Sequence, residues 1–159
     1  MRLAEKIKII FTLGILAAVT TWFIPTPSEA SVLMSGNVMI VTDDRGGSIM
    51  RRDNEVKDLQ DRGVLVRIQG RVCLSSCTMY LGVKNVCVSP ETIFGFHGPS
   101  RNSKAINQAS FDYFSKVMAK DYPPAISKWF MEKARYKIAT DYYRVSGQEL
   151  IRHGIAPCL

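Results

Sequence analysis

Three short segments of the chain place reactive side chains next to small residues, in patterns that can support acyl transfer. Gly46 and Gly47 stand in Arg-Gly-Gly-Ser, where adjacent glycines permit a sharp turn and leave backbone amides exposed near a helix start. Ser75 stands in Gly-Arg-Val-Cys-Leu-Ser-Ser-Cys-Thr, a turn that would put its hydroxyl at a helix start. His97 stands in Phe-Gly-Phe-His-Gly, at the end of an apolar run. A serine with a histidine is a nucleophile–base pair, and free amides can hold an oxyanion.

Each of these motifs also has an ordinary structural explanation. A Gly-Gly pair is most often only a turn, and a serine at a helix start is most often an N-cap. A single histidine at a strand end is often hydrogen bonded for structure alone. The order of the motifs favours a site, because all three fall at the ends of successive strand–helix units, where α/β folds place their ligands.

The four cysteines allow either disulfides or a metal site. Cys73, Cys77, Cys87 and Cys158 could form up to two disulfides, with three connectivities. A zinc site is the alternative to disulfides, but such sites usually contain two closely spaced pairs of ligands, and only one close pair of cysteines is present. A direct bond between Cys73 and Cys77 within one helix would need a distorted turn. Cys87 lies in an apolar run and also suits the role of a small buried hydrophobe.

The N-terminus has the pattern of an export signal. Residues 1–8 are basic, residues 9–24 carry no charge, and two prolines then precede a small-x-small exit that ends at Ala30. This predicts a signal peptide over residues 1–30, cleaved after Ala30. The alternative is an uncleaved membrane anchor, although a spanning helix needs about 20 apolar residues. The remaining part, residues 31–159, is then exported and holds all four cysteines.

Apolar runs alternate with amphipathic segments along the rest of the chain, which is the pattern of an α/β fold with a largely parallel sheet. The apolar runs predict strands at 38–41, 64–68, 86–88 and 92–96. The periodic segments predict helices at 48–62, 75–83, 108–120, 124–137 and 146–153. The first run is apolar throughout, as expected of a strand buried on both faces.

The composition is that of an ordinary globular chain with room for one domain. Of its 159 residues, 47% are hydrophobic and 22% are charged. The formal net charge is +7, but the basic residues are scattered, so the charge does not indicate nucleic-acid binding. No motif indicates a metal, a nucleotide or another cofactor.

Taken together, these segments resemble the Clp protease proteolytic subunit, a member of the crotonase-like (ClpP/crotonase) superfamily. The resemblance covers about residues 36–98 and 143–158. It is stronger to the small predicted periplasmic relatives of that subunit, with their Cys-x-Ser-x-Cys-Thr turn and Gly-Phe-His strand. It implies a ClpP/crotonase-like α/β fold over residues 31–159, with βαβ units and flanking helices. It also implies an exported, periplasmic serine hydrolase of peptidase type, acting on a peptide or small acyl substrate without a cofactor.

The resemblance assigns roles to individual residues. Ser75 falls on the nucleophile, with the adjacent Ser76 as the alternative. Ser75 is preferred because it stands between two cysteines, as in the exported relatives. His97 falls on the general base. The backbone amides of Gly47 and Ser76 fall on the oxyanion hole.

The third member of the triad, an aspartate, is the open position. Counting back from Ser146 puts Tyr142 there, with Asp141 one residue earlier. Asp141 is the candidate, although in an extended chain a one-residue shift reverses the direction of a side chain. Asp112 and Asp121 are further candidates.

The alternative function is that of an exported domain which keeps the fold but not the reaction, and acts as a binding or structural protein. In that case the cysteines form disulfides that stabilise the turn, Ser75 is a helix N-cap and His97 has a structural role only. The barrel of Clp protease is not expected, because an exported chain meets neither the cytosolic unfoldase nor ATP. A homo-oligomer and an N-terminal membrane anchor stay open.

Overall fold

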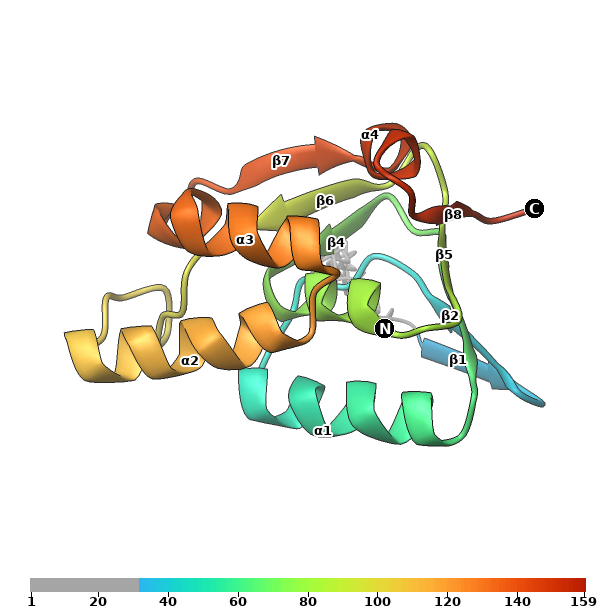
Figure 1. The fold of residues 1–159 in the computed structure, drawn as a ribbon, viewed down its shortest axis with the longest axis horizontal. Coiled ribbons are helices and arrows are strands. Elements are labelled where there is room, and N and C mark those ends of the chain that lie inside the picture. The colour runs from blue at the N-terminus through green and yellow to red at the C-terminus, as the bar shows by residue number, and fades with distance from the viewer. Residues whose placement is uncertain (1–31) are drawn as a thin grey trace, which may run out of the picture.

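Residues 32–159 are described by a computed structural model, which arranges their strands in two sheets (Figure 1). The larger sheet has the order β1 (Val32–Ser35), β2 (Val38–Val41), β3 (Leu65–Ile68), β5 (Val86–Val88) and β8 (Ala156–Pro157). The smaller sheet has the order β4 (Val72–Leu74), β6 (Ile93–Phe96) and β7 (Tyr143–Ser146). Only β1–β2 and β6–β7 pair antiparallel among these strands. The predicted signal peptide or anchor over residues 1–30 lies outside the described residues.

The helices pack beside and between the two sheets (Figure 1). They are α1 (Ile49–Asp61), the 3-10 helix η1 (Ser75–Gly82), α2 (Gln108–Lys120), α3 (Pro124–Glu132), the 3-10 helix η2 (Ala134–Tyr136) and α4 (Gly147–Arg152). Helix α1 packs on η1 and α2, and α2 packs on α3. The α/β class, the mostly parallel pairing and the flanking helices are therefore confirmed.

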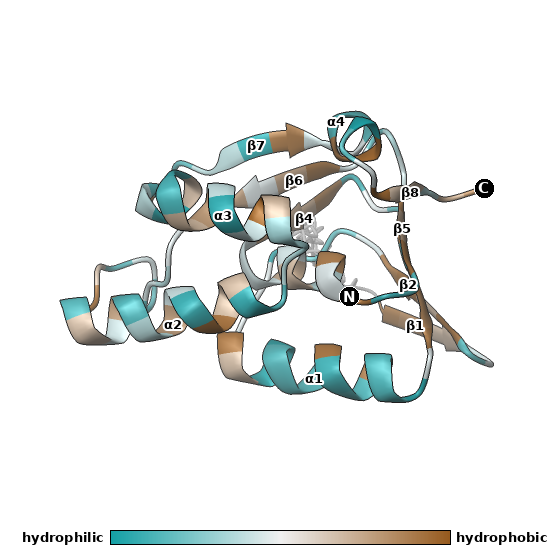
Figure 2. Ribbon diagram, viewed as in Figure 1, coloured by the Kyte–Doolittle hydropathy of each residue, from teal (hydrophilic) through white to brown (hydrophobic). Residues whose placement is uncertain are grey.

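Helix α1 illustrates how local residues set the boundaries of an element. Ser48 is its N-cap and accepts a hydrogen bond from the Arg51 amide, and Gly63, with φ of +63°, follows its end. Its buried side chains are Val56 and Leu59, one turn apart. Figure 2 shows the rest of α1 as mostly hydrophilic and the strands of the larger sheet as mostly hydrophobic.

The strands divide between two sheets because the chain bends sharply after β3. Gly70 lies so close to the preceding segment that a Cβ atom there would be 2.1 Å from the Asp43 amide nitrogen. The Asp43 carboxylate accepts hydrogen bonds from the Arg71 amide at 2.6 Å and from the Arg71 guanidinium. This bend directs the chain into β4, which pairs with β6 and starts the second sheet. The sequence pattern had not predicted β4, β7 or β8.

Four other local predictions differ from the structure. Residues 32–35, for which no strand was predicted, form β1 and pair with β2. In β2 only alternate residues are buried, so its second face is partly covered, not fully buried. The predicted helix at 75–83 is a 3-10 helix. The predicted helix at 124–137 ends at Glu132, and η2 follows it.

The cysteines form two disulfides, Cys73–Cys77 and Cys87–Cys158. The distortion expected for the first pair does not arise, because Cys73 belongs to β4 and Cys77 to η1, with 5.3 Å between their Cα atoms. Cys87 is paired, which corrects its reading as a lone buried hydrophobe. Residues 32–159 hold no cluster of side chains suited to a metal ion. Within the same range no helix is long and apolar enough to cross a membrane.

Candidate active site

Ser75 lies at a sharp turn between β4 and η1, in an uncommon backbone conformation. Its φ is +58°, in the left-handed region that residues other than glycine and asparagine seldom adopt. Its carbonyl oxygen accepts a hydrogen bond of 2.7 Å from the Thr78 hydroxyl, which closes the first turn of η1. A serine on a strained turn from strand to helix presents its hydroxyl away from the sheet. Such strain costs about 1–2 kcal/mol and persists where the surrounding contacts enforce it.

The Gly-Gly turn passes directly over Ser75. A Cβ atom on Gly46, whose φ is +88°, would lie 2.6 Å from the Ser75 Cβ and 3.0 Å from the Ser76 amide nitrogen. The next residue, Gly47, has open space where a Cβ would stand, and its amide has no hydrogen-bond acceptor within residues 32–159. The Ser76 amide belongs to the first turn of η1, where amides lack an intrahelical acceptor. Two free amides thus flank the Ser75 turn.

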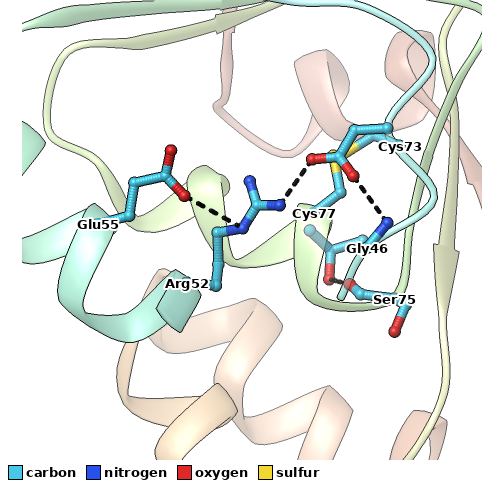
Figure 3. Close-up of polar contacts among 8 residues, drawn as sticks. Gly46, Arg52, Glu55, Cys73, Ser75 and Cys77 are labelled. Atoms are coloured by element: carbon cyan, nitrogen blue, oxygen red, sulfur yellow. Dashed lines mark hydrogen bonds and ion pairs between the residues drawn. A yellow bond between two sulfur atoms is a disulfide. The ribbon is translucent and has the colours of Figure 1, made fainter. Parts of the chain in front are cut away.

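A buried ion pair holds the Gly-Gly turn in place. The Asp44 carboxylate is almost fully buried, accepts 2.7 Å hydrogen bonds from the Gly46 amide and the Arg52 guanidinium, and so links the turn to α1. The Arg52 guanidinium also stacks over the Tyr80 ring of η1, 4.0 Å from its centroid. Figure 3 shows Arg52 extending from α1 with Glu55 on its other side. The sequence pattern did not single out Asp44. An aspartate two residues before a glycine signals a turn, but it does not show that the carboxylate is buried against Arg52.

His97 follows β6 and is buried, with a defined hydrogen bond on one ring nitrogen. Its Nδ1 lies 2.6 Å from the Gly98 carbonyl oxygen. A carbonyl can only accept, so Nδ1 carries the proton and Nε2 keeps its lone pair. Burial lowers the pKa of His97, and the bond to Gly98 opposes that effect in part. The imidazole is therefore a neutral group whose Nε2 can accept a proton.

None of the aspartates proposed as the third triad member forms a hydrogen bond with His97 within residues 32–159. Asp141 is exposed and pairs with Lys137 at 2.6 Å, and Asp112 pairs with Arg135 at 2.7 Å. Asp121 is buried beside Lys120. The acid position counted from the resemblance does lie beside His97, but a tyrosine occupies it.

Tyr142 packs against the imidazole edge-on, with 5.2 Å between the ring centroids. Its ring also lies where a side chain on Gly95 would stand, which explains the glycine in the Gly-Phe-His strand. The Gly98 carbonyl occupies the place at Nδ1 that a carboxylate takes in a Ser-His-Asp triad. The sequence could not indicate this partner, because every residue has a backbone carbonyl and only the fold brings one of them to His97.

A single pocket of about 610 Å³ brings the predicted groups together. It is lined by Ser75, His97 and Gly47, together with Tyr142. Ser76 is fully buried and does not line the pocket, which favours Ser75 over its neighbour as the reactive hydroxyl. The nucleophile, base and one oxyanion amide predicted from three separate segments therefore share one cavity.

The sequence matches no model of a known protein family and no curated protein. Function is therefore inferred from the site itself.

Proposed function

We propose that this protein is a serine hydrolase in which Ser75 is the nucleophile and His97 the general base. One observation carries the proposal: Ser75, held in a left-handed turn, shares a pocket with a histidine whose Nδ1 is engaged by the Gly98 carbonyl. That bond leaves Nε2 as the proton acceptor. The resemblance to the Clp proteolytic subunit further favours a ClpP/crotonase-like fold and a peptidase-like reaction.

The reaction follows from these groups. Ser75 Oγ attacks an acyl carbon and its proton passes to His97 Nε2, while the amide of Gly47, which lines the pocket, holds the tetrahedral oxyanion. The imidazolium then protonates the leaving group, and water hydrolyses the acyl-enzyme with His97 again as base. The Gly98 carbonyl orients the ring and stabilises the imidazolium by its dipole. A dipole stabilises a cation less than a carboxylate does, so we expect a slower enzyme than one with a complete triad.

The proposed compartment is outside the cytosol. Two disulfides are typical of an oxidising compartment, and the N-terminal segment has the pattern of an export signal. The proposed substrates are peptides or small acyl compounds.

Covalent labelling of the purified protein with a fluorophosphonate serine probe tests the proposal. The wild type should label, and Ser75→Ala should abolish the label. His97→Ala should slow labelling about 100-fold or more, because the general base is lost. Two controls should label normally: Ser76→Ala, whose buried hydroxyl has no hydrogen-bond partner among residues 32–159, and Asp141→Asn, whose carboxylate pairs with Lys137.

Two results would contradict the proposed reaction. The first is label retained in Ser75→Ala. The second is an unlabelled wild type that is folded and oxidised, which would favour the alternative of a catalytically silent binding module.

The pH dependence of labelling tests the role of His97. Because burial lowers its pKa, the imidazole stays neutral to lower pH than an exposed histidine with a pKa of 6.5. The labelling rate should therefore rise with pH through a midpoint below 6.5 and be flat above neutrality. Asp121 also titrates in this region, since burial and the Asp53 carboxylate raise its pKa to about 7. Asp121→Asn should leave the profile unchanged, and a midpoint that moves in this variant would argue against His97 as the titrating group.

A further inference from the structure

The charges that line the pocket are all of one sign. Arg45 and Arg101 line it, and no aspartate or glutamate does. Within residues 32–159 neither guanidinium has an ion-pair partner or a hydrogen-bond acceptor. Both arginines are therefore free to bind an anion that enters the pocket.

The acids around the pocket do not offset these two charges. The Asp44 carboxylate forms an ion pair with Arg52, Asp112 forms one with Arg135, and Asp141 forms one with Lys137. Each of these carboxylates already has a cationic partner at 2.6–2.7 Å. A cavity lined by one sign of charge with partly apolar walls concentrates ions of the opposite sign.

The two arginines reach the pocket from different segments, each with a defined backbone. Arg45 directly precedes the Gly-Gly turn. Arg101 and Lys104 exchange two backbone hydrogen bonds of 2.9 Å, which close a small hairpin between β6 and α2. The two residues at its tip, Asn102 and Ser103, both have positive φ, as in a type I′ turn. This hairpin holds the Arg101 backbone at the pocket.

One part of the pocket wall is apolar. The side chains that form it come from the start of α1, from α2 and from the segment before α2: Ile49, Met50, Ile106, Phe114 and Met118. An apolar group is the natural occupant of such a surface, because its burial removes it from water. A ligand that contacts both this apolar part and the two arginines therefore needs an apolar portion and a negative charge.

We propose that the pocket selects acyl substrates in which an apolar chain carries a carboxylate. The carboxylate would bind Arg45 and Arg101, the chain would lie on the apolar wall, and the acyl carbon would lie at Ser75. This assignment rests on the proposed hydrolase for its chemistry, but the charge preference is a property of the pocket alone. The carboxylate can belong to a peptide chain end, to an acidic side chain or to a small dicarboxylic acyl group.

Binding to Ser75→Ala tests the charge preference without any turnover. Three amides of equal chain length serve as probes: adipamic acid, which is anionic, hexanamide, which is neutral, and the ω-amino derivative of hexanamide, which is cationic. Nuclear magnetic resonance titration at low salt should show the anion binding about tenfold more tightly than the neutral amide, and the cation most weakly. High salt should reduce the difference, since exposed charges are screened.

Arginine variants in the same background show whether these two residues cause the preference. Arg45→Gln with Arg101→Gln should reduce the preference for the anion to less than about twofold, leaving the affinity for hexanamide unchanged. Arg152→Gln, which removes one positive charge on α4 outside the pocket lining, should bind all three probes as before. Equal affinities for the three amides, or a preference that survives the double substitution, would overturn the assignment.

Substrate pairs then connect the preference to turnover. Wild-type hydrolysis of the nitrophenyl ester of hexanoic acid, together with fluorophosphonate labelling, reports on the hydrolase alone. If the wild type neither hydrolyses this ester nor reacts with the fluorophosphonate, while Ser75→Ala still binds the anionic amide most tightly, the proposed reaction is wrong and the binding preference stands. Peptides with a free or amidated chain end, and with Glu or Gln, show where the carboxylate comes from. Faster cleavage of either acid than of its amide supports the assignment, and equal rates for both pairs contradict it.

Discussion

Gly46→Ala should abolish labelling of Ser75 and lower the free energy of unfolding by about 3 kcal/mol or more. The new Cβ would lie 2.6 Å from the Ser75 Cβ and 2.8 Å from the Leu74 carbonyl oxygen. Both neighbours belong to the β4–η1 turn, so no side-chain rotation can relieve the contact. The φ of +88° at Gly46 adds strain for any residue with a side chain.

Gly47→Ala is the matched control for that substitution. No atom lies within 4 Å of the Cβ position on Gly47, and its φ is not positive. We expect its stability to change by less than about 0.5 kcal/mol and its amide to remain available for the oxyanion. Denaturant unfolding and the labelling rate, measured on both variants, check the prediction. If Gly46→Ala is as stable and as reactive as Gly47→Ala, the Gly-Gly turn does not lie over Ser75 as described.

Removing the Cys87–Cys158 disulfide should cause the largest loss of stability of any cysteine change. Its cysteines are 71 residues apart, and closing a loop of that length restricts the unfolded chain by about 4 kcal/mol. The Cys73–Cys77 bond spans a separation of only 4 residues, for which the same estimate is about 2 kcal/mol. Cys87→Ala with Cys158→Ala should therefore have the lower denaturation midpoint of the two paired variants.

The short disulfide should instead matter for reactivity. Cys73 and Cys77 stand two residues either side of Ser75 and join β4 to η1 across its turn. With both replaced by alanine, the left-handed turn loses a covalent restraint, and labelling of Ser75 should slow while the protein stays folded. A paired variant that labels at the wild-type rate would show that the Asp44–Arg52 pair and Gly46 suffice to hold the turn.

Features set by a few neighbouring residues were predicted well from the sequence. Helix α1, between Ser48 and Gly63, is such a case, because a cap, a periodic apolar face and a helix-ending glycine all act within a few residues. The small-residue turn at Ser75 and the strand that ends at Phe96, directly before His97, are others. The sequence also placed Ser75, His97 and Gly47 at the ends of strand–helix units, and these three residues line one pocket.

Features that depend on segments distant in the chain were decided by the tertiary structure. Four cysteines permit three connectivities, and only the approach of β8 to β5 joins Cys87 to Cys158. The two adjacent glycines are alike in sequence, yet Gly46 alone is enclosed, because Ser75 packs against it. Strand β4 is too short to show a period, and its place in a second sheet depends on the bend that Asp43 and Arg71 hold.

The hydrogen-bond partner that orients His97 also could not be predicted from the sequence. The sequence indicated an aspartate near residue 141 as the partner of His97, because a sequence shows which side chains are present but not where backbone carbonyls point. In the folded chain Lys137 forms an ion pair with the Asp141 carboxylate, Tyr142 packs on the imidazole, and the Gly98 carbonyl accepts a hydrogen bond from His97 Nδ1. Residue types and spacing determined which side chains could react. Which atoms meet was decided by packing, because backbone carbonyls are present at every position and only the fold selects the one that faces the ring.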